Sequence, residues 1–179
     1  GEEFMKWQQL VTNIFLRISQ ELEMILDGLT VDELNKQPAP DANTIGWLVW
    51  HLTRGQDRGL GDAMGEEQLW IKDKWYARFN RAPDPADTGF RHGPKDVAAF
   101  RSPDGKTLLE YHRAVLERSR RYLEKELAEA DLEREVERPT LAMVLPVHVL
   151  IVGAINDGLQ HVGQAAYVRG LIKGQGWRR

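Results

Sequence analysis

The chain has no cysteine among its 179 residues. Disulfide bonds, thiolate metal sites and a cysteine nucleophile are therefore excluded, and a reducing compartment, the cytoplasm, is the expected location. Serine is scarce as well: Ser19, Ser102 and Ser119 are the only serines, and none lies in a nucleophile-elbow pattern. A glycine-rich phosphate-binding loop is also missing. Catalysis by a serine or cysteine nucleophile and nucleotide binding by a phosphate loop are therefore not expected.

Charge of one sign is not in excess, because 24 basic residues stand against 27 acidic ones and the net charge is −3. This balance gives no electrostatic reason to expect a nucleic acid partner. Long apolar runs are absent too. The longest apolar region, residues 141–155, is interrupted by Pro146, His148 and Gly153 and is shorter than the roughly 18 residues of a membrane span. No membrane segment is expected.

A hydrophobic content of 42% and a charged content of 28% are typical of a globular protein. The length suits one domain that covers residues 1–179. Apolar side chains recur at the three- and four-residue spacing of amphipathic helices in four long segments. In the first segment this stripe consists of Leu10, Ile14, Ile18, Leu22, Ile25 and Leu26. The four segments cover residues 3–27, 43–64, 106–128 and 146–173.

No segment shows the sustained alternation of a β-strand. Residues 66–104 join the second and third helical segments and are rich in aromatic side chains, so we expect an ordered connection that lies over one end of a bundle. The sequence therefore predicts an all-α fold, a four-helix bundle with a long crossover between helices 2 and 3.

The fourth segment contains two polar side chains in an otherwise apolar row. Asp157 and His161 are four residues apart and share one helix face, on which Ala154 and Ala165 also lie. A buried ionised carboxylate is costly, so Asp157 must pair, bind a metal or become neutral. His51 borders the core face of the second segment, and neighbouring helices of a bundle can share a ligand.

Two imidazoles and one carboxylate suit a divalent metal, namely Zn, Fe, Ni or Mn, and leave coordination positions open for water or substrate. The residues alone leave another interpretation open. In it, Asp157 and His161 pair with each other or with Arg54, Arg58 or Arg169. The imidazole of the second segment is then an ordinary core histidine.

Two more side chains lie one helical turn from this trio. Gln164 either hydrogen-bonds a ligand or simply packs, and Arg54 either binds an anionic substrate or pairs with Asp157. His92 and His112 have no partner pattern and are expected to be exposed, although His92 could reach the site from the connection.

Two patches of sequence resemble a known family. Residues 43–57, NTIGWLVWHLTRGQD, look like the second helix of the DinB-like superfamily. More narrowly, they resemble the branch that contains the N-terminal domains of mycothiol-dependent maleylpyruvate isomerases. Residues 157–174, DGLQHVGQAAYVRGLIKG, are similar to the last helix and tail of that family.

The resemblance implies a four-helix bundle in which three histidines hold a divalent metal, one on the second helix and two on the fourth. In this chain the three positions are His51, Asp157 and His161, so an aspartate stands where a histidine is usual. An aspartate can still ligate a metal. The resemblance further implies a metal-dependent enzyme, a transferase or isomerase that acts on a small molecule with a low-molecular-weight thiol as cosubstrate.

The aspartate leaves an alternative open, in which the metal site is degenerate and the bundle is a catalytically silent stress-response or binding module. A homodimer is expected in either case, because the fourth segment is apolar on more faces than one bundle needs. The other explanation of that surplus is that the connection at residues 66–104 covers the extra face.

Overall fold

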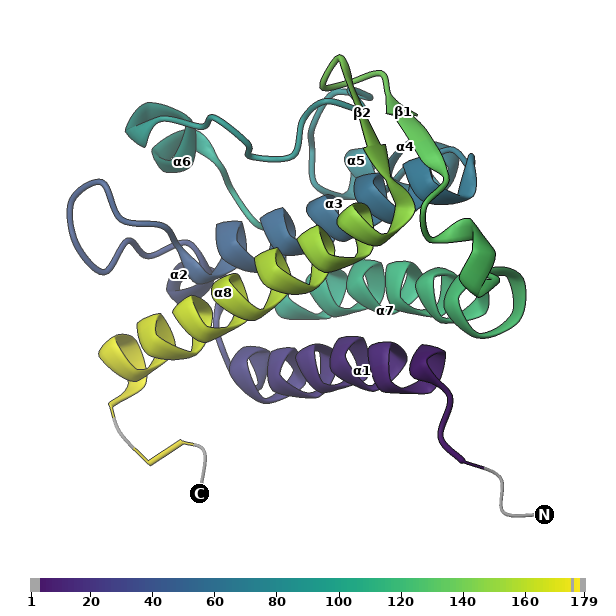
Figure 1. The fold of residues 1–179 in the computed structure, drawn as a ribbon. Helices are drawn as coiled ribbons and strands as arrows, with labels where there is room; N and C mark the ends of the chain where they lie inside the picture. The colour runs from purple at the N-terminus through teal and green to yellow at the C-terminus, as the bar shows by residue number, and fades with distance from the viewer. Residues whose placement is uncertain (1–3, 175, 178–179) are drawn as a thin grey trace.

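The computed structural model describes residues 4–174 and 176–177 and contains four long helices (Figure 1). They are α1 (Trp7–Leu26), α3 (Ile45–Met64), α7 (Gly105–Arg121) and α8 (Val147–Lys173). Helices α1 and α3 each pack against both α7 and α8, so the four surround one core. The predicted all-α four-helix bundle is therefore confirmed.

The helix ends follow local chemistry. Thr44 precedes α3, and its hydroxyl accepts a hydrogen bond of 3.1 Å from the backbone N–H of Trp47. Gly65 ends the same helix in the left-handed conformation, with a φ of 69°. Nearly every residue of α3 is buried, because its neighbours α7 and α8 and the connection that follows it cover most of its surface.

One residue of the predicted apolar stripe of α1 does not lie in the core. Leu10 is 58% exposed, whereas Ile18, Leu22 and Ile25 are buried. Steps of four residues rotate by about 40° around a helix with 3.6 residues per turn. The row that reaches Ile18 and Leu22 in such steps therefore begins at Leu10 well away from the buried side of the helix.

The connection between α3 and α7, residues 65–104, is the predicted crossover. It contains three short helices, α4 (Leu69–Lys72), α5 (Trp75–Arg78) and α6 (Pro94–Ala99). Most of its aromatic side chains are buried, and their packing orders the crossover. Those with exposures of 9% or less are Trp70, Trp75, Phe79 and Phe100. A further short helix, α2 (Val31–Leu34), precedes α3.

A buried ionic cluster around Asp57 fastens the crossover to α3. The carboxylate accepts hydrogen bonds of 2.9 Å from the backbone N–H groups of Leu69 and Trp70. It also accepts hydrogen bonds from Arg118 (2.5 Å) and from the Tyr111 hydroxyl (2.7 Å). Burial, followed by the charge of Asp57, raises the pKa of Tyr111 well above its ordinary value, so this phenol stays a donor.

A β-hairpin contradicts the prediction that no strand is present. After a π-helical turn (Tyr122–Glu126) and a 3-10 turn (Glu129–Asp131), β1 (Glu135–Arg138) pairs antiparallel with β2 (Met143–Pro146). Each strand has four residues, and Val136 is buried while its neighbours are charged, so the alternation is too short to recognise. Strand β1 contacts α3 and β2 contacts α8, so the hairpin covers one end of that helix pair.

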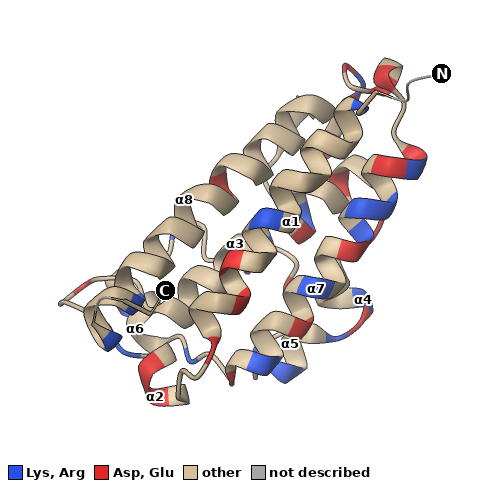
Figure 2. Ribbon diagram, turned by 90° about the horizontal axis from the view of Figure 1, so that it is seen from below, with Lys and Arg blue, Asp and Glu red and all other residues tan. Residues whose placement is uncertain are grey.

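Helix α8 has almost no charge along its length, whereas acidic and basic side chains line α7 (Figure 2). Within the part of the chain that the structure describes, no helix combines the length and the apolar character needed to cross a bilayer.

His112 on α7 is fully buried, which corrects the expectation that it is exposed. The hydroxyl of Thr53 donates to the carbonyl of Val49 (2.9 Å), so Nδ1–H of His112 donates to that hydroxyl oxygen (3.1 Å). Nε2 is left without a hydrogen-bond partner among the described residues. Burial, with a smaller effect of Arg113, lowers the pKa of His112 from 6.5 to about 4.

Because His112 is buried and its pKa is lowered, we expect the stability of the fold to fall in acid. The unfolded chain takes up a proton at His112 as the pH falls below 6.5, whereas the folded chain does so only near pH 4. The free energy of unfolding should therefore fall through that window, by about 3 kcal/mol over its full width. Urea unfolding at pH 7 and pH 5 measures the loss. His112→Gln should lose less stability over this interval than the wild type, and equal losses would contradict the assignment.

Candidate metal centre

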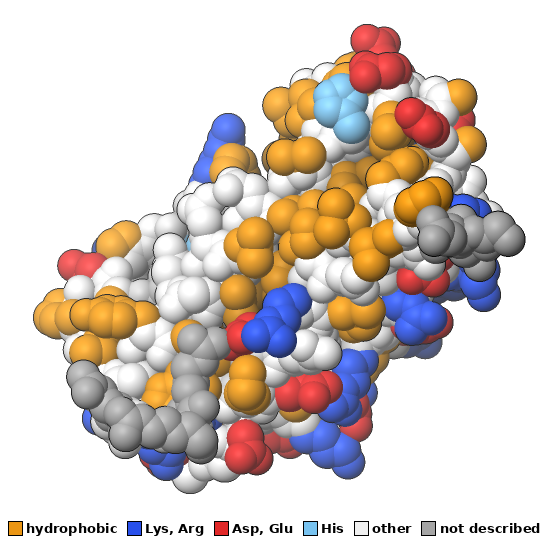
Figure 3. Space-filling model, turned by 60° about the horizontal axis from the view of Figure 1, so that its bottom comes forward, with side chains coloured by type: hydrophobic (Ala, Val, Ile, Leu, Met, Phe, Trp, Pro, Cys, Tyr) orange, Lys and Arg blue, Asp and Glu red, His pale blue; other side chains and the backbone are white. Residues whose placement is uncertain are grey.

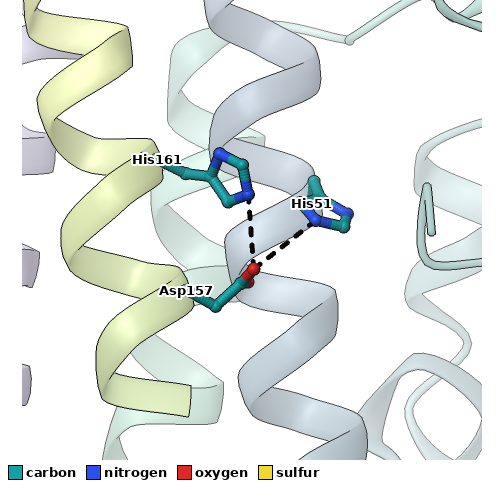
Figure 4. Close-up of side chains that lie close together, drawn as sticks. All are labelled: His51, Asp157 and His161. Carbon is teal, nitrogen blue, oxygen red and sulfur yellow. Dashed lines mark ion pairs between the residues drawn. The ribbon is translucent and has the colours of Figure 1, made fainter. Parts of the chain in front are cut away.

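Helices α3 and α8 pack against each other, and three side chains meet between them (Figure 4). Nε2 of His51 lies 3.7 Å from Oδ1 of Asp157, and Nε2 of His161 lies 3.3 Å from the same oxygen. One donor atom from each residue lies within 4.8 Å of the other two. The structure thus brings together all three residues that the sequence suggested as metal ligands.

Both imidazoles are held by their other nitrogen. The backbone carbonyl of Thr88 can only accept, so Nδ1 of His51 donates to it. Nδ1 of His161 donates to Oε1 of Gln164 at 2.7 Å. Each Nε2 therefore points toward Asp157. Histidines that bind metals are oriented in this way by an acceptor on the far nitrogen.

Trp47 of α3 and Gly89 of the crossover pack directly against the His51 ring. Trp47 stacks on one face of the imidazole, with ring centroids 4.6 Å apart and planes 12° from parallel. Gly89 has a φ of +85°, and a Cβ there would lie 2.8 Å from Nδ1 of His51 and 2.9 Å from the Trp47 ring. Only glycine suits this backbone conformation at so close an approach.

His92 also belongs to this packing rather than to the exposed surface that was expected. Its Nδ1 accepts a hydrogen bond of 3.2 Å from the Trp47 indole, and its ring stacks near Trp50 with centroids 6.0 Å apart. It is not a member of the cluster of donor atoms. Its contacts instead help to hold the crossover against α3 beside His51.

The protonation of the two histidines differs. Burial lowers the pKa of His51, although its bond to Thr88 and the charge of Asp157 oppose the shift. Burial also acts to lower the pKa of His161, but hydrogen bonds to Asp157 and Gln164 outweigh it and raise the pKa. His51 is therefore neutral near pH 7, while a metal must displace a proton that Asp157 favours on His161.

Two arginines that the sequence placed near this site lie elsewhere. Arg54 is fully buried and donates to the backbone carbonyls of Asp87 (2.9 Å) and Pro85 (3.1 Å) and to Asp57. The suggestion that it binds substrate or pairs with Asp157 is corrected, because its guanidinium is used to hold the crossover. Arg169 donates to the backbone carbonyl of Asp27 at 2.7 Å, near the end of α1.

A cavity of about 260 Å³ opens beside the trio, with His51 and Asp157 in its wall. Arg58 of α3 and Arg138 of β1 also line it, together with Phe90 of the crossover. Sequence reasoning gave neither Arg138 nor Phe90 a role and considered Arg58 only as an ion-pair partner. No local pattern marks Arg138 or Phe90, since they reach the cavity through the hairpin and the crossover.

Gly55 lies against the candidate ligand Asp157. A Cβ at this position would be 2.9 Å from Oδ2 of Asp157, which is closer than carbon and oxygen approach without a shift. The carboxylate ends a flexible side chain and can move away, so the fold should survive a methyl group here while the carboxylate loses its position.

Gly55→Ala is therefore expected to lower the affinity for a divalent metal by roughly 10- to 100-fold, as loss of a ligand-orienting contact does elsewhere. Isothermal titration with Zn²⁺ measures the change. Gly163→Ala is the matched control, because it lies on α8 with nothing within 4 Å of the added methyl group. Equal affinities of the two variants would show that the position of the Asp157 carboxylate does not matter.

Comparisons with known proteins agree with this architecture. A family model described as the DinB superfamily matches residues 14–165. A solved structure of a conserved protein from Enterococcus faecalis is similar, with a TM-score of 0.83 and 29% sequence identity over 96% of this chain and 100% of that chain. None of the curated proteins matches. Because the family model covers most of its length, the chain belongs to the DinB superfamily.

Proposed function

We propose that this protein is a divalent-metal-dependent enzyme in which His51, Asp157 and His161 hold the ion. One observation supports this most strongly: two imidazole Nε2 atoms face one carboxylate while an acceptor holds each Nδ1–H. A structural ion pair needs only one histidine. Two imidazoles and a carboxylate fit Zn, Ni, Fe or Mn in the divalent state.

When bound, such an ion lowers the pKa of a thiol or a water molecule and so supplies a nucleophile near neutral pH. The protein contributes the rest. Thr88 and Gln164 keep the two imidazoles in the tautomer that can ligate. Trp47 covers one face of His51, and Phe90 lines the cavity, so both limit the access of water.

The substrate proposed is a small molecule, and the cosubstrate proposed is a low-molecular-weight thiol. A cavity of about 260 Å³ suits a molecule of a few heavy atoms rather than a polymer. The thiol follows from the resemblance of residues 43–57 and 157–174 to the mycothiol-dependent branch of the family. The reaction is then a thiol-dependent transfer or isomerisation.

Elemental analysis of the purified protein tests this proposal, with an expected content of about one divalent metal per chain. The metal-loaded protein should then consume a small thiol in the presence of an electrophile, measured as loss of free thiol groups. His161→Ala should lose both properties. A wild-type protein that binds none of Zn, Ni, Mn or Fe would instead be a catalytically silent module.

We also propose that the protein is a homodimer. Five apolar side chains of α8 stay exposed along one side of that helix: Val149, Val152, Leu159, Tyr167 and Leu171. Hydrophobic side chains gather in a band on the face of the molecule seen in Figure 3. The crossover does not cover these residues, and exposed apolar faces of this kind are typical of interfaces. Sedimentation velocity should give twice the 20.5 kDa of one chain, and a monomer would contradict the proposal.

A further inference from the structure

Arg58 is a largely buried cation with no direct hydrogen-bond or ion-pair partner among the described residues. Its side chain lies in the wall of the cavity beside His51 and Asp157, and the residue is only 8% exposed. Its Nε has no hydrogen-bond acceptor among the described residues, and no carboxylate of those residues lies within ion-pair distance. A buried guanidinium without an acceptor is costly, so an arginine kept in this state points to a ligand that completes it.

Arg138 of β1 supplies a second guanidinium to the wall of the same cavity. The β-hairpin carries it over α3, where its Nε donates to Asp62 at 2.9 Å. Its terminal nitrogens make no hydrogen bond with the described residues, and Nη2 lies 3.9 Å from where a Cβ of Gly59 would be. Asp62 therefore orients this arginine and leaves its outer N–H groups available to the cavity.

The charges around the cavity do not cancel once a metal is bound. Burial, then the charges of Arg138 and Arg54, lower the pKa of Arg58 to about 10 against the opposing charges of Asp62 and Asp157, so Arg58 is still a cation at neutral pH. Asp62 compensates Arg138, and Asp157 would be occupied as a metal ligand. The positive charge of Arg58 is left for a bound anion.

The cavity also has room between these cations and the candidate ligands. Gly55 and Gly59 of α3 and Gly153 of α8 lie in its wall, and none of them adds a side chain to the space. A Cβ at Gly153 would meet nothing within 4 Å. A ligand of a few carbons can therefore reach from the arginines to His51 and Asp157.

We propose that Arg58 and Arg138 form a carboxylate subsite, and that the substrate or the thiol cosubstrate is a small organic acid. Arginine matches a carboxylate because its planar fork donates two parallel hydrogen bonds. The acid lies with its carboxylate at the arginines and its reacting end at His51 and Asp157. Its role as a substrate site rests on the proposed function, but the binding of the carboxylate itself needs only the arginines.

Isothermal titration of the full-length protein with succinate, in the presence and in the absence of Zn²⁺, tests the subsite. Succinate should bind, its uncharged diamide should not, and Arg138→Gln should weaken succinate binding at least tenfold. Arg58→Gln should have the same effect, but Arg138 is the safer variant because its side chain is only partly buried. Arg113→Gln is the control, since that arginine pairs with Glu23 on the exposed surface.

Circular dichroism shows whether each variant is folded, and a Zn²⁺ titration of Arg138→Gln separates the two proposals. Two results overturn the subsite alone. In the first, Zn²⁺ binding is intact but the protein does not prefer succinate to the diamide. In the second, folded Arg138→Gln binds succinate as tightly as the wild type does. Absent Zn²⁺ binding with arginine-dependent succinate binding overturns the metal centre and supports the subsite.

A second pair of ligands identifies the source of the carboxylate. In the Zn²⁺-loaded protein, 3-mercaptopropionate is compared with propionate. If Zn²⁺ strengthens binding of the thiol acid alone, the subsite holds the carboxylate of the thiol cosubstrate. If both bind alike through Arg138, it holds the carboxylate of the other substrate. Both results support the subsite, and binding of either acid that is unchanged in Arg138→Gln contradicts it.

Discussion

Replacing His51 by alanine should reduce the affinity for divalent metals by at least roughly 100-fold, more than the loss of an orienting contact causes. The substitution removes one of three candidate ligands and the only one on α3. Asp157 and His161 then form an ordinary i, i+4 pair, which binds metals weakly. Isothermal titration with Zn²⁺ or Ni²⁺ measures the change.

The matched control is His148→Ala, which removes a histidine near the start of α8. Its Nδ1 contacts the backbone carbonyl of Leu132 at 3.0 Å, and it does not belong to the donor cluster. The control should bind metal as the wild type does. If His51→Ala also retains wild-type affinity, any metal is bound elsewhere and the candidate centre is wrong.

Asp57→Ala should destabilise the protein by about 3–5 kcal/mol, a large share of the total stability of a domain. The substitution leaves Arg54 and Arg118 buried without their carboxylate, and it removes the acceptor of two backbone N–H groups of the crossover. Urea denaturation followed by circular dichroism measures the loss in free energy of unfolding.

Glu23→Ala is the comparison for this variant. Glu23 pairs with Arg113 across α1 and α7, but both side chains are about half exposed, so removing it should cost less than about 1 kcal/mol. A loss at Asp57 that is no larger than the loss at Glu23 would show that the buried cluster does not hold the crossover in place.

The helices and the trio of candidate ligands could be predicted because local spacing determines them. Asp157 and His161 share a face whatever the tertiary structure, and an apolar row on both sides of them indicates that the face is turned inward. Packing of α3 against α8 then brings His51 to them. Predicting the bundle requires only the helical periodicity of the four long segments.

The cavity could not be predicted in the same way. Arg54 is three residues from His51 and points about 60° away from it around the helix, whereas Arg58 is seven residues away and points only about 20° away. Distance along the chain therefore favoured the wrong arginine. Thr88 and Arg138 belong to the crossover and the hairpin, and their positions follow from tertiary packing that no local spacing encodes.

X-ray absorption spectroscopy of the zinc-loaded protein identifies the atoms bound to the metal. We expect a first shell of nitrogen and oxygen with the multiple-scattering signal of two imidazoles, which falls to one imidazole in His161→Ala. A wild-type spectrum without imidazole scattering, or one that His161→Ala leaves unchanged, would contradict the candidate metal centre.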